Sequence, residues 1–432
     1  MTVRAPARGS NLPGPLRSLR FRDYRLLLAA TVMQNLTMPM QFITLTFWAA
    51  DTYEGKTALV SSLIMGVRGA GMLLFSFLGG AFADRFERRK VLLVCECTAF
   101  TVTALMGLTM VTKPFGDATI AAVIGLVFLS AANMATDGPS RTASIPVIVG
   151  QENMASAIAL NNVAQQLTFP LIIPIVGFLS GTIGPGKVVL VSLVAWAVIF
   201  PSISLLKYSS RNAVTKRRSV RGTLQDVRAG LRYAKGSSAI LAIIGMLATM
   251  QVVGMPGVGM LGPVWMTEVL DLSRAQFGLV AMLWGVGALV SSLVFALWVS
   301  ATRRATTLAG VVVCFAVAGI VFAHSREPVL TAAANAVLGA AMTGAMVTAM
   351  TTIQYAVADD MRGRVMGLFP LVMGGSMLAV APVGAVSQVV GLELVVPILE
   401  WATLGIALLL IATLPVLRGS PVRVPRPAPE TA

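Results

Sequence analysis

The chain has 432 residues, of which 56% are hydrophobic and only 12% are charged. Soluble domains average about 45–50% apolar and about 25% charged residues, so this composition excludes a water-soluble enzyme. The formal net charge of +15 would suggest nucleic-acid binding in a soluble protein, so the distribution of the charge along the chain decides its meaning.

Apolar stretches recur along the whole chain, and each approaches the roughly 20 residues that a membrane-spanning helix needs. In chain order the twelve predicted spans are 25–50, 57–82, 90–112, 117–139, 154–181, 186–206, 238–266, 274–299, 304–323, 328–353, 364–390 and 393–417. The sequence therefore predicts an all-α membrane protein with twelve transmembrane helices, for which the lipid bilayer is the surrounding partner.

Lysine and arginine gather in alternate loops between these spans. The rich segments lie before the first span, at 85–90, at 141, at 207–235, at 303–304, at 362–364 and after 417. The intervening loops hold only Lys56, Lys113, Lys187, Arg274 and Arg326. Because basic loops remain in the cytoplasm, both termini are predicted to be cytoplasmic, and the nucleic-acid interpretation is rejected.

The longest charged segment, 207–237, divides the chain into two halves. Within it Leu224, Val227 and Leu231 share one helical face, which favours an amphipathic helix on the inner membrane surface over a solvated linker. The predicted organisation is a tail over 1–24, a six-helix bundle over 25–206, the linker over 207–237, a second six-helix bundle over 238–417 and a disordered tail over 418–432. Both halves have basic residues after their second span, which indicates two pseudo-symmetric bundles with a substrate site between them.

A motif follows the second span and reads Gly80-Ala-Phe-Ala-Asp84-Arg85-Phe-Glu87-Arg88-Arg89-Lys90. It resembles the signature between helices 2 and 3 of the major facilitator superfamily, with Glu87 where the family has a second glycine. Further short motifs resemble the branch that holds the enterobactin exporter and the macrolide efflux permeases. They are Phe21-Arg22-x-Tyr24-Arg25, Arg68, Val149-Gly150-Gln151-Glu152-Asn153, Gln354-Tyr355 and Arg362-Gly363-Arg364.

The resemblance implies a secondary transporter with the major facilitator fold. It also implies that Asp84 closes the cytoplasmic side by contacting the N-terminus of helix 11, with Arg141 as a partner. A helix N-terminus favours a carboxylate because of its unpaired amides and positive dipole. The gate residues predicted in this way are Gly80, Asp84, Arg85, Arg88, Arg89, Arg141, Gly363 and Arg364.

Polar residues inside the predicted spans are the candidates for a substrate cavity, because polar side chains at membrane depth must face protein or water. Several fall on one face of helix 1 or of helix 5, which line the cavity in the resembled family; hydrogen bonding between helices is the alternative. Arg68 cannot deprotonate; it would hold an anionic group or bias a neighbouring carboxylate, and a structural ion pair or snorkelling is the alternative. The predicted cavity residues are Gln34, Gln41, Arg68, Asn161, Gln165, Gln251 and Asn335.

Acidic residues inside the predicted spans are candidates for proton coupling. They are Glu96, Asp137 and Glu400. A role at helix interfaces is the alternative for Glu96 and Glu400, and a cap or gate role is the alternative for Asp137. Neither a nucleotide-binding motif nor a metal-ligand set is recognisable, so we expect no cofactor and no metal.

The sequence therefore predicts an efflux antiporter of the cell membrane that exports a small amphipathic molecule, such as a drug, a macrolide or a siderophore-like compound. Alternating access driven by the proton gradient is the expected mechanism, and the protein is expected to act as a monomer. An importer or facilitator on the same fold is the alternative, and a membrane sensor that does not transport is a more remote one. An enzyme is not expected, since no nucleophile, base and orienting group recur together.

Overall fold

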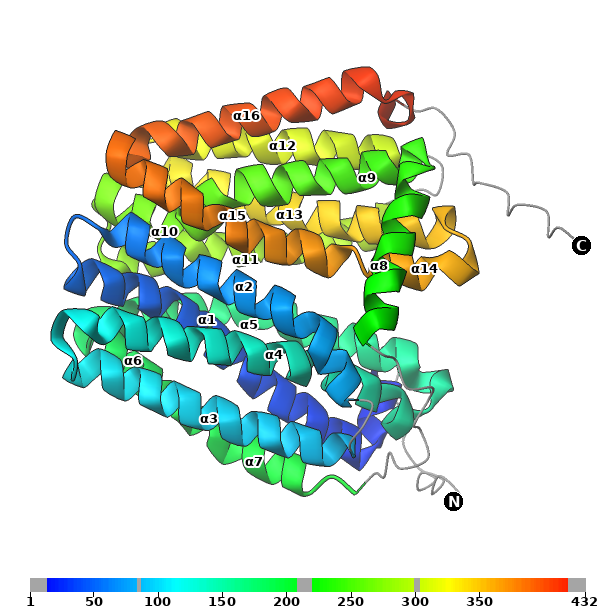
Figure 1. Cartoon of the computed structure of the whole chain (residues 1–432), viewed down its shortest axis with the longest axis horizontal. Helices are drawn as coiled ribbons and strands as arrows, with labels where there is room; N and C mark the ends of the chain where they lie inside the picture. Colours follow the sequence, from blue (N-terminus) through cyan, green and yellow to red (C-terminus); the bar gives the residue numbers. More distant parts are fainter. Residues whose placement is uncertain (1–13, 84–86, 208–219, 299–303, 419–432) are drawn as a thin grey trace, which may run out of the picture.

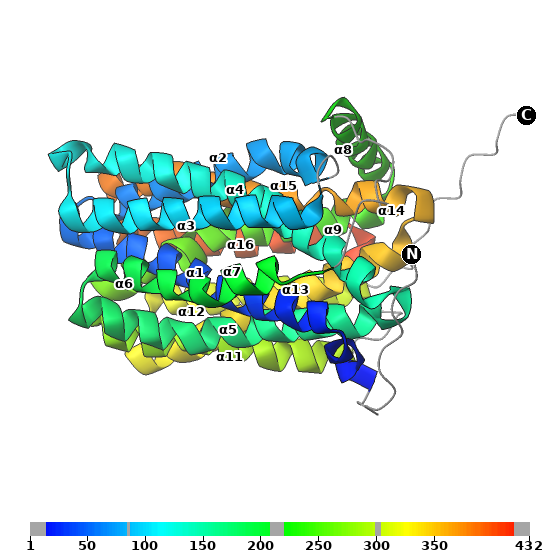
Figure 2. The same cartoon turned by 90° about the horizontal axis from the view of Figure 1, so that it is seen from below.

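A computed structural model describes residues 14–83, 87–207, 220–298 and 304–418, and every regular element in these ranges is a helix. Eleven described helices are long and apolar enough to cross a membrane. A twelfth span begins with α9 and continues through a series of π-helical turns. The long helices lie side by side in two views at right angles (Figure 1, Figure 2).

The first six spans form the N-terminal bundle, drawn in the lower half of Figure 1. Its elements are α1 (Arg22–Thr52), α2 (Thr57–Ala83), α3 (Arg88–Thr112), α4 (Thr119–Val149), α5 (Met154–Thr182) and a sixth span made of α6 (Pro185–Ser192), η4 (Leu193–Ala195) and α7 (Trp196–Ser204). Three short 3-10 helices accompany them, namely η1 (Gly14–Arg20), η2 (Gly116–Ala118) and η3 (Gln151–Asn153).

The other six spans form the C-terminal bundle in the upper half of Figure 1. They comprise α9 (Ser238–Ala248) with its continuation, α11 (Arg274–Trp298), α12 (Arg304–His324), α13 (Pro328–Ala356), α14 (Asp359–Met366) with α15 (Phe369–Val390), and α16 (Leu392–Thr413), followed by η8 (Pro415–Arg418). The predicted fold class, twelve helices in two six-helix bundles, is confirmed.

The seventh span departs from a regular α-helix. After α9 it continues as η5 (Thr249–Gly254), η6 (Pro256–Met260), α10 (Gly262–Val264) and η7 (Trp265–Val269). Pro256 and Pro263 cannot donate backbone hydrogen bonds, so the ladder is re-formed with wider turns around them. Such π-helical turns are frequent at functional sites.

The segment between the bundles contains α8 (Val220–Lys235), which bends by 112° relative to the span that follows it. It crosses the ends of the long helices beside α14 (Figure 1). Gly230 permits this packing, because a Cβ atom there would lie 2.6 Å from the carbonyl oxygen of Arg364. We call this end of the molecule the basic end; α1 and α5 begin here, and the sequence predicts that it faces the cytoplasm.

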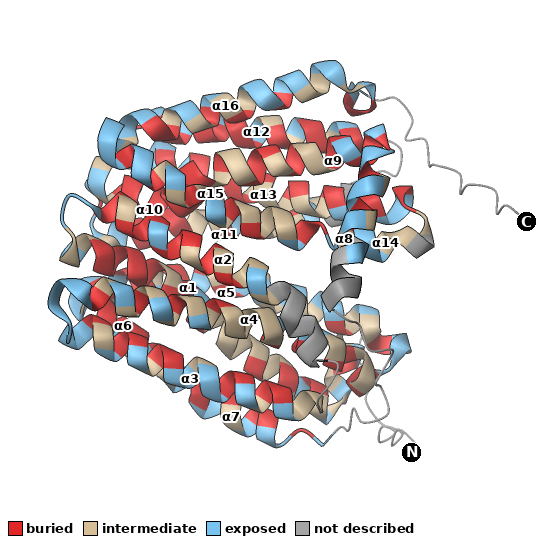
Figure 3. Ribbon diagram, in the orientation of Figure 1, coloured by how far each residue is buried: buried red, intermediate tan, exposed pale blue. Residues whose placement is uncertain are grey.

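Many large apolar side chains are exposed on the outer surface. Figure 3 shows that exposed residues lie on the outward sides of the helices. Leu74, Val194 and Leu293 are each at least 60% exposed. A soluble protein rarely exposes contiguous apolar surface of this kind. The bilayer accounts for it, since hydrocarbon tails solvate these side chains.

Candidate substrate cavity

A cavity of about 650 Å³ lies between the two bundles. Most of its wall comes from α1, α2, α4 and α5, while α13 and α15 supply the wall on the C-terminal side. It extends from the middle of α1, at Gln41, to residues near the basic end, such as Tyr24 of α1 and Phe369 of α15. A cleft between the bundles is where the two halves of such a fold can enclose a small molecule.

Contacts between the bundles join them at the end opposite the basic end. Arg274, the first residue of α11, forms an ion pair with Asp51 of α1 and donates a hydrogen bond of 2.9 Å to the carbonyl oxygen of Ser180 in α5. Its guanidinium group also lies 5.2 Å from the ring centre of Phe47. Gln388 of α15 adds a hydrogen bond of 2.9 Å to the carbonyl oxygen of Gly55. The described cavity therefore faces the basic end and is closed at the other.

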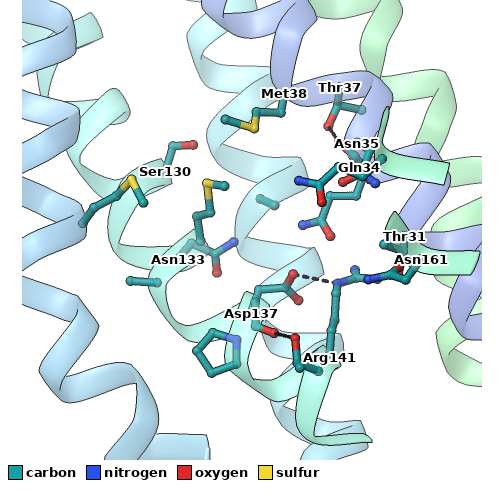
Figure 4. Close-up of a pocket in the computed structure, with 18 of the residues that line it drawn as sticks. Thr31, Gln34, Asn35, Thr37, Met38, Ser130, Asn133, Asp137, Arg141 and Asn161 are labelled. Atoms are coloured by element: carbon teal, nitrogen blue, oxygen red, sulfur yellow. Dashed lines mark hydrogen bonds and ion pairs between the residues drawn. The ribbon is translucent and has the colours of Figure 1, made fainter. Parts of the chain in front are cut away.

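A cluster of buried charges lies beside the cavity, centred on Arg141 of α4. Its Nε donates to Asp137 Oδ2 at 2.7 Å (Figure 4). Its Nη2 forms an ion pair with Glu96 of α3. Trp196 of α7 donates to the other oxygen of Glu96 at 3.0 Å, and Arg141 Nη1 also donates to Thr31 of α1 at 3.3 Å. We call these residues the Arg141 cluster; it ties four helices of the N-terminal bundle together.

Arg68 lies near the middle of α2 and lines the cavity, but it is not part of this cluster. Its side chain is buried, with 4% of its surface exposed. One guanidinium nitrogen contacts the sulfur of Met134 at 3.7 Å, and Nε has no hydrogen-bond partner among the described residues.

A family model described as transmembrane secretion effector matches residues 13–424. The chain belongs to this family. It is therefore a transporter of the major facilitator type, consistent with the paired bundles and the cavity between them. No curated protein matches the sequence at a significant level.

Solved transporter structures resemble the whole fold. A nucleoside transporter superposes with a TM-score of 0.74 at 14% identity, covering 90% of this chain and 99% of that one. A bacterial homologue of the iron transporter ferroportin, described as inward-facing, gives 0.72 at 14% identity, with 92% and 99% covered. A D-xylose–proton symporter gives 0.68 at 12% identity, with 93% and 98% covered. At such identities the likeness shows the fold alone.

The structure of this transporter places the predicted cavity residues in two groups. Gln34, Gln41, Arg68, Asn161 and Gln165 line the cavity, although the amide of Gln41 also donates to Thr103 of α3 at 2.7 Å. The other two are outside its wall. Gln251 Nε2 lies 2.9 Å from the sulfur of Met373, and Asn335 donates to the carbonyl oxygen of Val280 at 3.3 Å.

The acidic candidates also separate. Asp137 lines the cavity. Glu96 does not line the cavity, but it forms an ion pair with Arg141, which does. Glu400 of α16 is fully buried within the C-terminal bundle, where its carboxyl group packs against Gly257 and Gly319. Neither of its oxygens has a hydrogen-bond partner among the described residues, and it does not line the cavity.

The predicted gate residues are described only in part, because Asp84 and Arg85 lie outside the described residues. Arg88 donates to the carbonyl oxygen of Ala143 in α4 at 2.8 Å, and Arg89 donates to that of Ser204 in α7. These contacts hold the start of α3 against its neighbours. Further members occupy the same end of the molecule, with Gly80 near the end of α2 and Gly363 and Arg364 inside α14.

Sequence reasoning singled out Asp137 and Arg141 of α4, but as proton-coupling and gate residues, and it missed Ser130 and Asn133 in the same wall. Ser130, Asn133 and Asp137 all line the cavity, and Figure 4 shows Asn133 and Asp137 directed toward Gln34 of α1. Their spacing of three and four residues places them on one helical face. This polar stripe in an apolar span was a signal as clear as the one in helix 1.

Proposed function

We propose that this transporter is a secondary active exporter of small amphipathic molecules in the cell membrane. The cavity between the bundles is the observation that carries the proposal, because it faces the basic end and is closed at the other by Arg274 and its partners. With both termini in the cytoplasm, substrate enters this cavity from the cytoplasm. The family description, a secretion effector, supports export as the direction.

The wall of the cavity supports an amphipathic substrate. It combines carboxamide side chains with many methionines, whose flexible thioethers adapt to varied apolar shapes. The methionines are Met38, Met72, Met134, Met346, Met350 and Met373. Such a wall suits a molecule with an apolar body and several hydrogen-bonding groups, as in drug-, macrolide- or siderophore-like compounds.

We assign proton coupling to the Arg141 cluster. Asp137 and Glu96 share one arginine, so protonation of either carboxylate leaves Arg141 paired with the other. Asp137 lines the cavity and its Oδ1 atom has no hydrogen-bond partner among the described residues, which gives a proton a route from the cavity to the cluster. Movement of Arg141 between the two carboxylates would alter the packing of α3 against α4.

Everted membrane vesicles with an imposed pH gradient test the proposal. We expect one class of a panel of macrolides, lipophilic cations and catecholate siderophores to release protons from the vesicles. Asp84→Asn and Asp137→Asn should abolish the signal at unchanged expression. The exposed Glu152→Gln serves as the matched control and should keep it. Proton-driven movement of the substrate out of the vesicles, which is toward the cytoplasmic face of the membrane, would identify an importer and contradict export.

A further inference from the structure

The two buried arginines beside the cavity differ in the number of carboxylate partners that they have among the described residues. Arg141 has two carboxylate partners, whereas Arg68 forms no ion pair with any described residue. Asp137 is one helical turn from Met134, the residue that Arg68 contacts, but its carboxylate pairs with Arg141. Within the described ranges, Arg68 is thus a buried guanidinium group at the cavity wall that has no counter-ion.

An arginine in this position is costly to the protein alone. A guanidinium group cannot lose its proton to escape burial, and removing its charge from water without a partner is strongly unfavourable. The sulfur of Met134, 3.7 Å from its Nη2, is a weak acceptor. Ionisable residues at membrane depth commonly mark a ligand or ion path.

We infer that the substrate carries an anionic group and that Arg68 binds it. This inference rests on the proposed transport function and specifies the substrate class of the same cavity. The planar guanidinium group suits a carboxylate or a sulfonate, which can accept two parallel hydrogen bonds from it. Arg68 Nε is buried and lacks a described partner, so one such donor is available.

The surroundings of Arg68 define the rest of the ligand. Met72 of α2 and Met134 of α4 line the same cavity as Arg68, and Phe369 and Met373 line it from α15. These side chains accommodate an aromatic or alicyclic body. Asn133 and Asn161 offer amides for further polar groups. The expected substrate is therefore an amphipathic anion rather than a lipophilic cation.

Matched probes test this inference by calorimetric titration of the purified full-length protein. Naphthaleneacetate is compared with naphthaleneacetamide, and naphthalenesulfonate with naphthalenesulfonamide. Each pair shares its apolar body and differs in charge. A hydrogen-bonded charge supports binding of the anion about 10- to 100-fold tighter than the amide. Equal affinities, or binding of neither probe at millimolar concentration, would overturn the inference.

Variants then assign the discrimination to one residue. Arg68→Gln should remove the preference for the anion, and Arg68→Lys should retain part of it because the charge remains. Arg228→Gln, an exposed arginine of α8, is the matched control and should bind like the parent. A preference that survives in Arg68→Gln would contradict the role of Arg68, and the wild-type comparison remains decisive if that variant does not fold.

The binding and transport experiments fail separately. An Arg68-dependent preference without proton-linked export would support the anion site and contradict the proposed export. Export of macrolides or lipophilic cations, which are not anions, with no preference for the anionic probes in titration would support export and contradict the anion site.

Discussion

Arg141 forms ion pairs with two buried carboxyl groups in the N-terminal bundle. Both Glu96 and Asp137 contact it, and all three side chains are buried. Breaking a buried ion pair by removing one partner leaves an uncompensated charge, which costs about 3–5 kcal/mol of unfolding free energy. Arg141→Gln should therefore lower the thermal midpoint in detergent markedly, and Arg141→Lys should lower it less. An Arg141→Gln protein as stable as the parent would show that Glu96 and Asp137 do not form stabilising ion pairs with Arg141.

Glu400 gives the opposite expectation at the same scale. Its carboxyl oxygens have no hydrogen-bond partner among the described residues, so replacing the side chain breaks no such contact. Glu400→Met keeps an unbranched side chain of similar length against Gly257 and Gly319. Removing an unsatisfied buried polar group should stabilise the protein by about 1 kcal/mol or more, measured by thermal unfolding. Retained transport in the same variant would exclude Glu400 as the proton carrier, whereas lost transport in a stable protein would restore it as a candidate.

At the scale of elements, apolar length predicted the spans because a bilayer fixes the length of helix that crosses it. The second span, predicted over 57–82, is α2 over Thr57–Ala83. Apolar length does not specify the backbone hydrogen-bond pattern, so the π-helical turns after α9 were not foreseen. The sequence also does not show which group a buried polar side chain contacts. Asn335 satisfies the carbonyl oxygen of Val280, whereas Gln34 faces the cavity.

The seam between α5 and α11 tests how closely the bundles must approach. A Cβ atom on Gly278 would lie 2.9 Å from Pro174 Cα, so Gly278→Val should force the two helices apart. We expect a buried reporter cysteine, Ser180→Cys, to react several-fold faster with a membrane-impermeant maleimide, after subtraction of labelling at the native cysteines. Gly405→Val is the matched control, because nothing lies within 4 Å of a Cβ atom there. Equal labelling in both variants would mean that the seam tolerates the added side chain.

At the scale of the whole molecule, the two ends of the interface between bundles have different chemistry. The basic end holds the cavity and is spanned by α8, whereas the opposite end is joined by Arg274, Asp51 and Gln388. The proposed transport by alternating access would require this closed end to open without loss of the fold. Partly exposed polar contacts suit that purpose, because each is worth only about 1 kcal/mol and can be exchanged for water.

The Arg274–Asp51 pair should therefore set the balance between the two states. A loss of about 1 kcal/mol changes a two-state population roughly fivefold, so Arg274→Gln and Asp51→Asn should each add a longer-distance population at the closed end. Spin labels on the exposed Lys187 and Val329, one in each bundle, report the separation in a cysteine-free background. If the pair acts as a unit, the double variant should resemble the single ones. Arg326→Gln breaks an ion pair with Glu393 inside one bundle and should leave the distances unchanged. Unaltered distances in all of these variants would shift the closing role to the helix seams, where glycines rather than charges hold the bundles together.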